Sequence, residues 1–438
     1  MSARTFPAGK RVAITGLGMI SPIGDDLETI WNHISTGKSG IRPLENLPTD
    51  CLPFKSGAEV KSFTGDIADY GPLDKALQRA IKKNMKVMCR EIEMGVAAAQ
   101  KALIHSQQAE SHAPERCGCL FGCDYILTRP EEYVDGMRNC LEQTGTTDIQ
   151  HWPTLGLPKV GPLWLLKYLP NMPNSHVSIY NDFRGPNNSI TMREASMGLA
   201  VAEAASIIRR GAADLMIVGA TGSRVHPLRI THVTMIDRLA SECDPPSRMA
   251  RPFDRTCDGM VLGEGAGAVI LESWEMAQAR GATIWGEVIG HGSAMFGPSP
   301  DGRDYIRMAV RNSLQSAIRS APNMPRQWHV HAHGIGIPQA DQSEALAIGD
   351  VLQGLGTIPV TTAKSYTGNL GAGSAALELA CSILALKHNA LFPILNLNDP
   401  MPAVTWSAAQ LGQPSGSAFV HSSFTQQGQA SSLVIAAA

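Results

Sequence analysis

Three histidines alternate with small residues in the segment HVHAHG: His329, His331 and His333. In a β-strand alternate residues project from one face, so the three imidazoles would lie side by side and could bind a metal or move a proton. Successive positions on one face are about 6.6 Å apart, which tetrahedral zinc accepts only if the strand is distorted. The pattern therefore favours a strand end with one functional histidine over a metal site.

The other motifs that suggest chemistry are incomplete. Cys117, Cys119 and Cys123 are spaced too closely along a predicted strand for a Cys₄ zinc site, so they are expected in the core. The GKS segment at 37–39 has Asn32 where a phosphate loop requires its first glycine, and the GLG segment at 16–18 has Ser21 at the third glycine position of a dinucleotide fingerprint. We expect neither a metal nor a cofactor.

The composition describes a globular protein of 438 residues, 44% hydrophobic and 17% charged. The net charge of 37 − 39 = −2 gives no general attraction for nucleic acid or an anionic membrane. Nine cysteines, an odd number, together with a start that lacks an apolar signal segment, predict free thiols and a cytoplasmic location. The most apolar stretch, 375–395, contains Glu378 and Lys387 and is expected to be a buried helix followed by a strand, not a membrane span.

Short β-branched runs alternate with alanine-rich helical stretches, which is typical of an α/β fold. Strands are expected at 11–16, 117–121 and 215–218, with a long helix at 195–211 before the third. The pattern of a strand followed by small residues returns after residue 273, so we expect a duplicated fold with halves at 1–272 and 273–438. A Pro- and Trp-rich insertion at about 124–174 interrupts the first half, and the Gln/Ser-rich segment 425–432 is expected to be a loop before a final strand.

Five blocks, in order, resemble one family from end to end. They are RVAITGLGMISPIG (11–24), SIYNDFRGPNNSI (178–190), RPFDRTCDGMVLGEGAGAVILE (251–272), HAHGIGIPQADQSEA (331–345) and AKSYTGNLGAGSAALE (363–378). The chain is thereby identified as similar to the β-ketoacyl-acyl carrier protein synthase II type of the thiolase superfamily. The resemblance implies layers in the order α-β-α-β-α, two mixed five-stranded sheets, and a dimer formed through the strand beside the nucleophile helix.

In such enzymes a cysteine at a helix N-terminus accepts an acyl chain, and two histidines stabilise the oxyanion and the enolate. This sequence retains His333 and Lys364 but has Glu194 at the nucleophile position and Asn369 at the second histidine. No cysteine lies within forty residues of Glu194. The gate segment SFTQQGQA places Gln426 at the gate position, between Phe424 and Gly428.

Glu194 at a helix N-terminus is expected to be ionised and to pair with His333 as an imidazolium. Its acyl derivative would be an anhydride, too labile to serve as an intermediate. We therefore favour a condensation-incompetent partner of an active synthase, similar to chain-length factors, which also lack the cysteine.

Two alternatives stay open. One is a malonyl-carrier decarboxylase, or another modified acyl-thioester chemistry, which the His333 and Asn369 pair would favour. Against it, two like charges about 4 Å apart at an effective dielectric near 20 repel by about 4 kcal/mol, so Glu194 would oppose a malonyl carboxylate. The other is a scaffold that binds acyl groups or carrier protein without any chemistry.

The resemblance implies acyl carrier protein and an acyl or malonyl thioester as partners, in a homodimer or in a heterodimer with an intact ketosynthase. Carrier proteins are acidic, and four cations recur at near-helical spacing as docking candidates: Lys82, Lys83, Lys86 and Arg90. Three methionines nearby, Met85, Met88 and Met94, fit the core better than an acyl tunnel.

Overall fold

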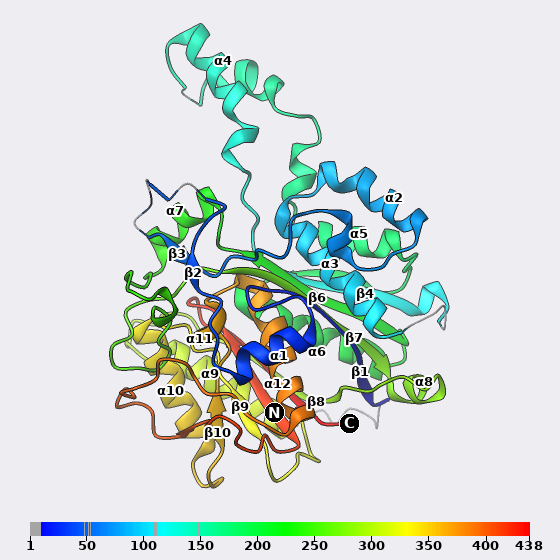
Figure 1. Cartoon of the computed structure of the whole chain (residues 1–438), viewed down its shortest axis with the longest axis vertical. Coiled ribbons are helices and arrows are strands. Elements are labelled where there is room, and N and C mark those ends of the chain that lie inside the picture. The colour runs from blue at the N-terminus through cyan, green and yellow to red at the C-terminus, as the bar shows by residue number, and fades with distance from the viewer. Residues whose placement is uncertain (1–9, 48, 51, 53, 108–111, 148) are drawn as a thin grey trace.

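A computed structural model describes residues 10–438 except residues 48, 51, 53, 108–111 and 148 (Figure 1). Eleven strands form one sheet in the order β11-β10-β9-β12-β13-β8-β1-β7-β6-β4-β5. Their bounds are β1 Val12–Ile20, β4 Cys117–Cys123, β5 Asn187–Thr191, β6 Leu215–Ser223, β7 Glu264–Ser273, β8 Gly286–Met295, β9 His329–His331, β10 Pro359–Thr361, β11 Ser407–Ala408, β12 Ala418–Phe424 and β13 Gln429–Ala436. A separate short hairpin pairs β2 (Arg42–Pro43) with β3 (Ser56–Gly57).

The same pairing pattern occurs twice. From β1 through β7, β6 and β4 to β5, neighbouring strands are antiparallel twice and then parallel twice. From β8 through β13, β12 and β9 to β10, the order of antiparallel and parallel pairs is identical. The duplication expected from the sequence is therefore present in the strand topology.

Helices cover both faces of each half of the sheet. The longer ones are α1 Leu27–Ser35, α2 Lys75–Asn84, α3 Arg90–His105, α4 Val134–Thr144, α5 Met172–Tyr180, α6 Ser196–Arg209, α7 Pro227–Ile236, α9 Tyr305–Arg319, α10 Pro338–Leu352 and α12 Ser374–His388, with the shorter α8 Trp274–Ala279 and α11 Lys364–Thr367. The buried faces of α6 and α12 share one apolar cluster with strands of both halves, while α3 lies in a second cluster and α9 and α10 in a third. The layers therefore run α-β-α-β-α, as expected.

The sheet differs from the expectation in its continuity. We expected two five-stranded sheets, but β1 and β8 pair at Ala13–Glu287 and Ile14–Gly286 and so join the halves, and the two-residue strand β11 adds a further edge. The Gln/Ser-rich segment also differs, because its residues from Gln429 onward pair with β8 and β12 in strand β13. Within the described part of the chain, no helix has the length and apolarity needed to cross a membrane.

Candidate functional site

Glu194 lies in a 3₁₀ turn, Arg193–Ala195, that leads directly into α6. Arg193 has a φ of 50°, the left-handed region that disfavours residues with a Cβ atom. Two strands of the other half fix this turn: Ser423 of β12 donates to the carbonyl of Glu194 at 2.6 Å, and Ser431 of β13 donates to that of Ala195 at 3.1 Å. The side chain of Glu194 is buried at the point where the two halves meet.

The Glu194 carboxylate is paired with arginines. Its Oε1 contacts Nη2 of Arg224, which is itself fully buried, and its Oε2 lies 3.5 Å from Nε of Arg193. Asn369 donates from Nδ2 to Oε1 at 3.0 Å. Burial alone would raise the pKa of Glu194, but the two guanidinium groups and the amide outweigh it and hold that pKa well below its usual range. Glu194 is therefore an ionised carboxylate without a proton to share.

The ion pairs continue beyond Glu194. Asp124 Oδ2 lies 3.7 Å from Nη2 of Arg224 and 3.4 Å from Nη2 of Arg229, while Arg193 also pairs with Asp237 at 3.0 Å. Together these side chains bring three guanidinium groups against three carboxylates, so the charges within the group balance. A fourth carboxyl, Glu91, has its pKa raised to about 8 by burial and is protonated at neutral pH. The expected pairing of Glu194 with an imidazolium of His333 is wrong, because the arginines take that role.

His333 is neutral. Burial and the nearby Lys364 ammonium hold the pKa of its imidazole well below the usual value. Lys364 Nζ lies 3.0 Å from Nδ1 of His333, and a lysine can only donate, so the imidazole proton resides on Nε2. Nε2 is buried and has no hydrogen-bond partner among the described residues. An N–H in this position can stabilise an oxyanion or enolate.

Other buried groups hold this arrangement. Lys364 also pairs with Glu378, which accepts from Nε2 of His421 at 2.8 Å. Glu344 accepts from the backbone amides of His333 and Gly334 at 2.7 and 2.8 Å, which fixes the loop after β9. Asp341, the other carboxylate of this block, accepts from three further backbone amides.

Asn369 connects the two sides of the site. Its Oδ1 accepts from the amide of Gly371 at 3.0 Å, and its Nδ2 lies 3.4 Å from Sδ of Met260 in addition to the bond to Glu194. Both amide hydrogens thus face atoms of this chain. Asn369 has no free donor for a substrate carbonyl.

The gate segment forms a tight turn between β12 and β13, in which Gly428 donates to the carbonyl of Thr425 at 2.9 Å. Gly428 has a φ of 82°, and a Cβ atom there would lie 1.9 Å from the carbonyl oxygen of Phe296, so only glycine fits. The Phe424 ring centroid lies 4.5 Å from that of His333, which places this residue of the gate segment, though not Gln426 itself, against the site. Gln426 is half-buried, and its carbonyl accepts from the Tyr305 hydroxyl at 2.9 Å.

The other two histidines of the HVHAHG segment are hydrogen-bonded within the core. His329 bonds Ser382 and the carbonyl of Ser415, and His331 bonds Ser382 and the amide of Ala363, so each ring nitrogen already has a partner. Two of the three imidazoles are thus held in the core, and the functional role of His333 stays a prediction. Cys123 packs in the apolar cluster that contains α3, on the sheet face away from α6, so its thiol does not face Glu194.

The docking candidates separate into two groups. Lys82, Lys83 and Lys86 are exposed on α2 and the turn that follows it. Arg90 instead pairs with Glu264 at 2.7 Å and donates to two backbone carbonyls, so it is a structural cation. The three nearby methionines lie in or against the apolar cluster around α3, as a core function requires: Met85, Met88 and Met94.

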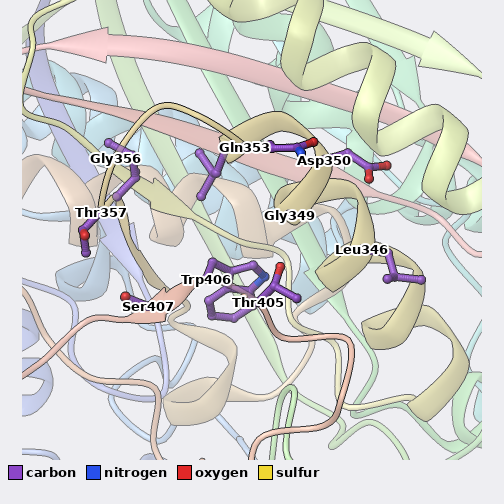
Figure 2. Close-up of a pocket in the computed structure, with 11 residues that line it drawn as sticks. Leu346, Gly349, Asp350, Gln353, Gly356, Thr357, Thr405, Trp406 and Ser407 are labelled. Carbon is purple, nitrogen blue, oxygen red and sulfur yellow. The ribbon is translucent and has the colours of Figure 1, made fainter.

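Sequence reasoning missed the arginines and their carboxylate partners. Asp124 directly follows β4, and Arg224 directly follows β6. A charged residue immediately after a buried parallel strand is the signal that could have identified them, because the carboxyl ends of such strands meet at one edge of the sheet. A pocket of about 510 Å³ lies elsewhere, between the end of α10 and the loop that contains Trp406, and includes none of these residues (Figure 2).

Two protein-family models match this chain, one in each half. Residues 9–277 match the family model for the β-ketoacyl synthase N-terminal domain, and residues 282–398 match that for its C-terminal domain. The chain is 33% identical over 403 residues to the 3-oxoacyl-[acyl-carrier-protein] synthase 2 of Coxiella burnetii, covering 89% of each chain. It is 31% identical over 404 residues to the Synechocystis protein of the same name, covering 90% of this chain and 89% of the other.

Two solved structures share the fold. A β-ketoacyl synthase from Burkholderia phymatum superposes with a TM-score of 0.81 at 24% identity, and the ishigamide ketosynthase/chain length factor with a TM-score of 0.80 at 22% identity. Each match covers 98% of this chain and 100% of the other.

Proposed function

Because the chain belongs to the β-ketoacyl synthase family, we propose that it is a member unable to condense acyl chains, which acts as the chain-length-factor-like partner of an active synthase. The observation that carries this proposal is the Glu194 carboxylate at the nucleophile position, paired with Arg224 and hydrogen-bonded to Asn369. A carboxylate held in this way attacks a thioester poorly, since its lone pairs already interact with cationic and amide donors. Its low pKa also makes it a weak general base.

Decarboxylation of a malonyl thioester is the second candidate, and the His333 geometry favours it. The C–C bond to the carboxylate would break, CO₂ would leave, and the resulting enolate would take a proton from water. His333 Nε2–H is free to stabilise that enolate. Arg193 and Arg224 also offset the repulsion expected between Glu194 and a malonyl carboxylate. Against it stands Asn369, whose amide hydrogens are already engaged.

The proposed partners are acyl carrier protein and a second chain of the same fold. One solved structure with this fold is a ketosynthase in complex with its acyl-carrier protein, and another is a ketosynthase/chain length factor. In this chain β5 is an edge strand with most of its residues exposed, which leaves it free to pair across a two-fold axis in a homodimer or a heterodimer. We place this assembly in the cytoplasm, a reducing compartment in keeping with free thiols.

A cationic surface supports the carrier-protein proposal. The exposed cations of α2 and its following turn make no ion pair among the described residues, and their charges stay available to an acidic partner. They are Lys75, Arg79, Lys82, Lys83 and Lys86. A triple variant with Lys82→Glu, Lys83→Glu and Lys86→Glu should bind acyl carrier protein at least tenfold more weakly in titration calorimetry. Lys38→Glu, an exposed control outside α2, should leave this affinity unchanged.

Two assays separate the functions. Co-expression with the cysteine-bearing synthase of the same organism should yield a complex with altered product chain length, and this chain alone should release no CO₂ from malonyl-carrier protein. Release of CO₂ that His333→Ala abolishes would instead establish the decarboxylase. A chain that binds carrier protein but neither forms the complex nor releases CO₂ would be a scaffold, and both the partner and the decarboxylase proposals would be wrong.

A further inference from the structure

A long arm leaves the body of the molecule between β4 and α5. It comprises residues 124–171, contains α4, and extends well beyond the layers of the fold (Figure 1). Its own core is small: Tyr133 packs edge-on against Trp152 and Trp164, with ring centroids 5.8 and 5.7 Å apart. The arm's direction must therefore be set largely where it joins the body.

The first junction, at Asp124 and Tyr125, is held by charge. Arg229 donates to the carbonyl of Tyr125 at 2.6 Å, and its guanidinium lies 3.9 Å from the centroid of the Tyr125 ring. Asp124 accepts from the amide of Tyr125 at 2.8 Å. The other oxygen of Asp124 faces Arg224 and Arg229, so the arm begins inside the ion-pair group described above.

Glu194 connects this group to the rest of the protein. Its backbone is fixed from β12 by Ser423, and its carboxylate holds Arg224, which in turn faces Asp124. If Glu194 were neutral, the group would carry one excess positive charge in a buried place, where an unpaired ion is costly. Arg224 would then move toward Asp124 and disturb its contacts with Arg229.

We propose that Glu194 is a positioning residue that holds the first junction of the arm. The position at which the family has its nucleophile thus serves here to orient a projecting surface. This inference goes beyond the proposed function, since it requires neither an acyl ligand nor a partner chain.

Hydrogen exchange on the isolated chain tests it. Glu194→Gln keeps the shape of the side chain and removes its charge, and it should accelerate amide exchange in peptides covering 124–137 about tenfold, with β6 unchanged. Trypsin should also cut faster after those basic residues of the arm that no proline follows, which are Arg138, Lys159 and Lys167. A merely structural loss would speed exchange in β6 and in the arm alike.

Four further variants complete the test. Glu203→Gln, a half-buried carboxylate on α6 that bonds Asn188, is the matched control and should not change exchange in the arm. Asp124→Asn should reproduce the Glu194→Gln effect, and the double variant should add little, because both act through Arg224. If Glu194→Gln does not fold, Glu194→Asp keeps the charge on a shorter stem and should give a smaller acceleration. At least one Glu194 variant that folds is needed for the comparison. If amide exchange in its arm is no faster than in the Glu203→Gln control, the proposal is wrong.

Discussion

The two walls of the site, one around His333 and one around Glu194, use their buried charges differently. On the C-terminal wall Lys364 orients His333, whose Nε2 has no partner among the described residues. On the N-terminal wall Glu194 lies between Arg193 and Arg224. Both walls are buried and charged. On the C-terminal wall the charges leave an N–H donor facing the site, and on the N-terminal wall they neutralise one another.

The difference shows which site residues also belong to the fold. Lys364 pairs with Glu378, and Glu344 fixes the loop that carries His333, so these groups remain useful whether or not any chemistry occurs. Glu194 likewise belongs to the fold, because it forms a buried ion pair with Arg224.

Loss of Arg224 should have the largest effect on stability. Arg224→Met leaves Glu194 and Asp124 buried with too little positive charge, and we expect a loss of about 3–5 kcal/mol in the free energy of unfolding. Denaturant titration measures it, and Glu194→Leu combined with Arg224→Met should recover most of the loss. Arg255→Met removes an exposed pair with Asp399 and should cost less than about 1 kcal/mol. Equal losses for the two single variants would show that the arginine wall is not a buried network.

Lys364→Met should lower the free energy of unfolding by less than Arg224→Met, by about 1–3 kcal/mol, although the ion pair of Lys364 is equally buried. The reason is that Glu378 keeps a second hydrogen-bond partner in Nε2 of His421. The same titration compares Lys364→Met with Arg224→Met. A larger loss of unfolding free energy in Lys364→Met than in Arg224→Met would contradict the expectation that the N-terminal wall depends more on its ion pairs.

Glu91 should give the N-terminal wall a pH dependence. Burial raises its pKa from the ordinary 4.5 to about 8, so between these values the folded chain holds a proton that the unfolded chain has released, and stability falls as the pH rises. Glu91→Gln should make the slope of unfolding free energy against pH less negative by about 1.4 kcal/mol per pH unit between pH 5.5 and 7. The exposed Glu28→Gln variant is the control, and an unchanged slope in Glu91→Gln would contradict the assignment.

The substitution Glu194→Cys should have the smallest effect, because we expect it to leave condensation activity almost unchanged. In Glu194→Cys the thiol would lie at the start of α6 beside two arginines, which favour a thiolate, so it should react readily with iodoacetamide. We nevertheless expect no measurable chain elongation, because Asn369, at the proposed position of the second histidine, supplies an amide and not an imidazole. Peptide mass mapping locates the label against the wild-type chain, and a product assay with malonyl- and acyl-carrier protein measures condensation. Substantial elongation by this single variant would show that the C-terminal wall alone completes an active centre.

The fold was largely predictable from the sequence. The repeated strand pattern predicted the duplication, and the layered architecture followed from the family resemblance; both are confirmed. The joining of the sheets was not predictable, because it depends on only two residue pairs between β1 and β8.

The composition of the site was predictable, but its electrostatics were not. The sequence blocks identified Glu194, His333 and Asn369, and they meet in the structure. Whether Glu194 pairs with an imidazolium depended on Arg224, thirty residues away at the end of β6, which no sequence block marked. Burial and Lys364 then keep His333 uncharged, an outcome that residue identity alone does not determine.

The bond between Ser423 and Glu194 has a consequence for biosynthesis. It joins residues 229 positions apart, and β1 is likewise flanked by strands β7 and β8 that leave the ribosome much later. The first half thus has an unfilled sheet edge at β1 until β8 has been made, and an unanchored start of α6 until almost the whole polypeptide has been made. Such distant contacts slow folding and leave aggregation-prone intermediates exposed. This chain should therefore depend on chaperones, or on early binding to another subunit, to reach its native state.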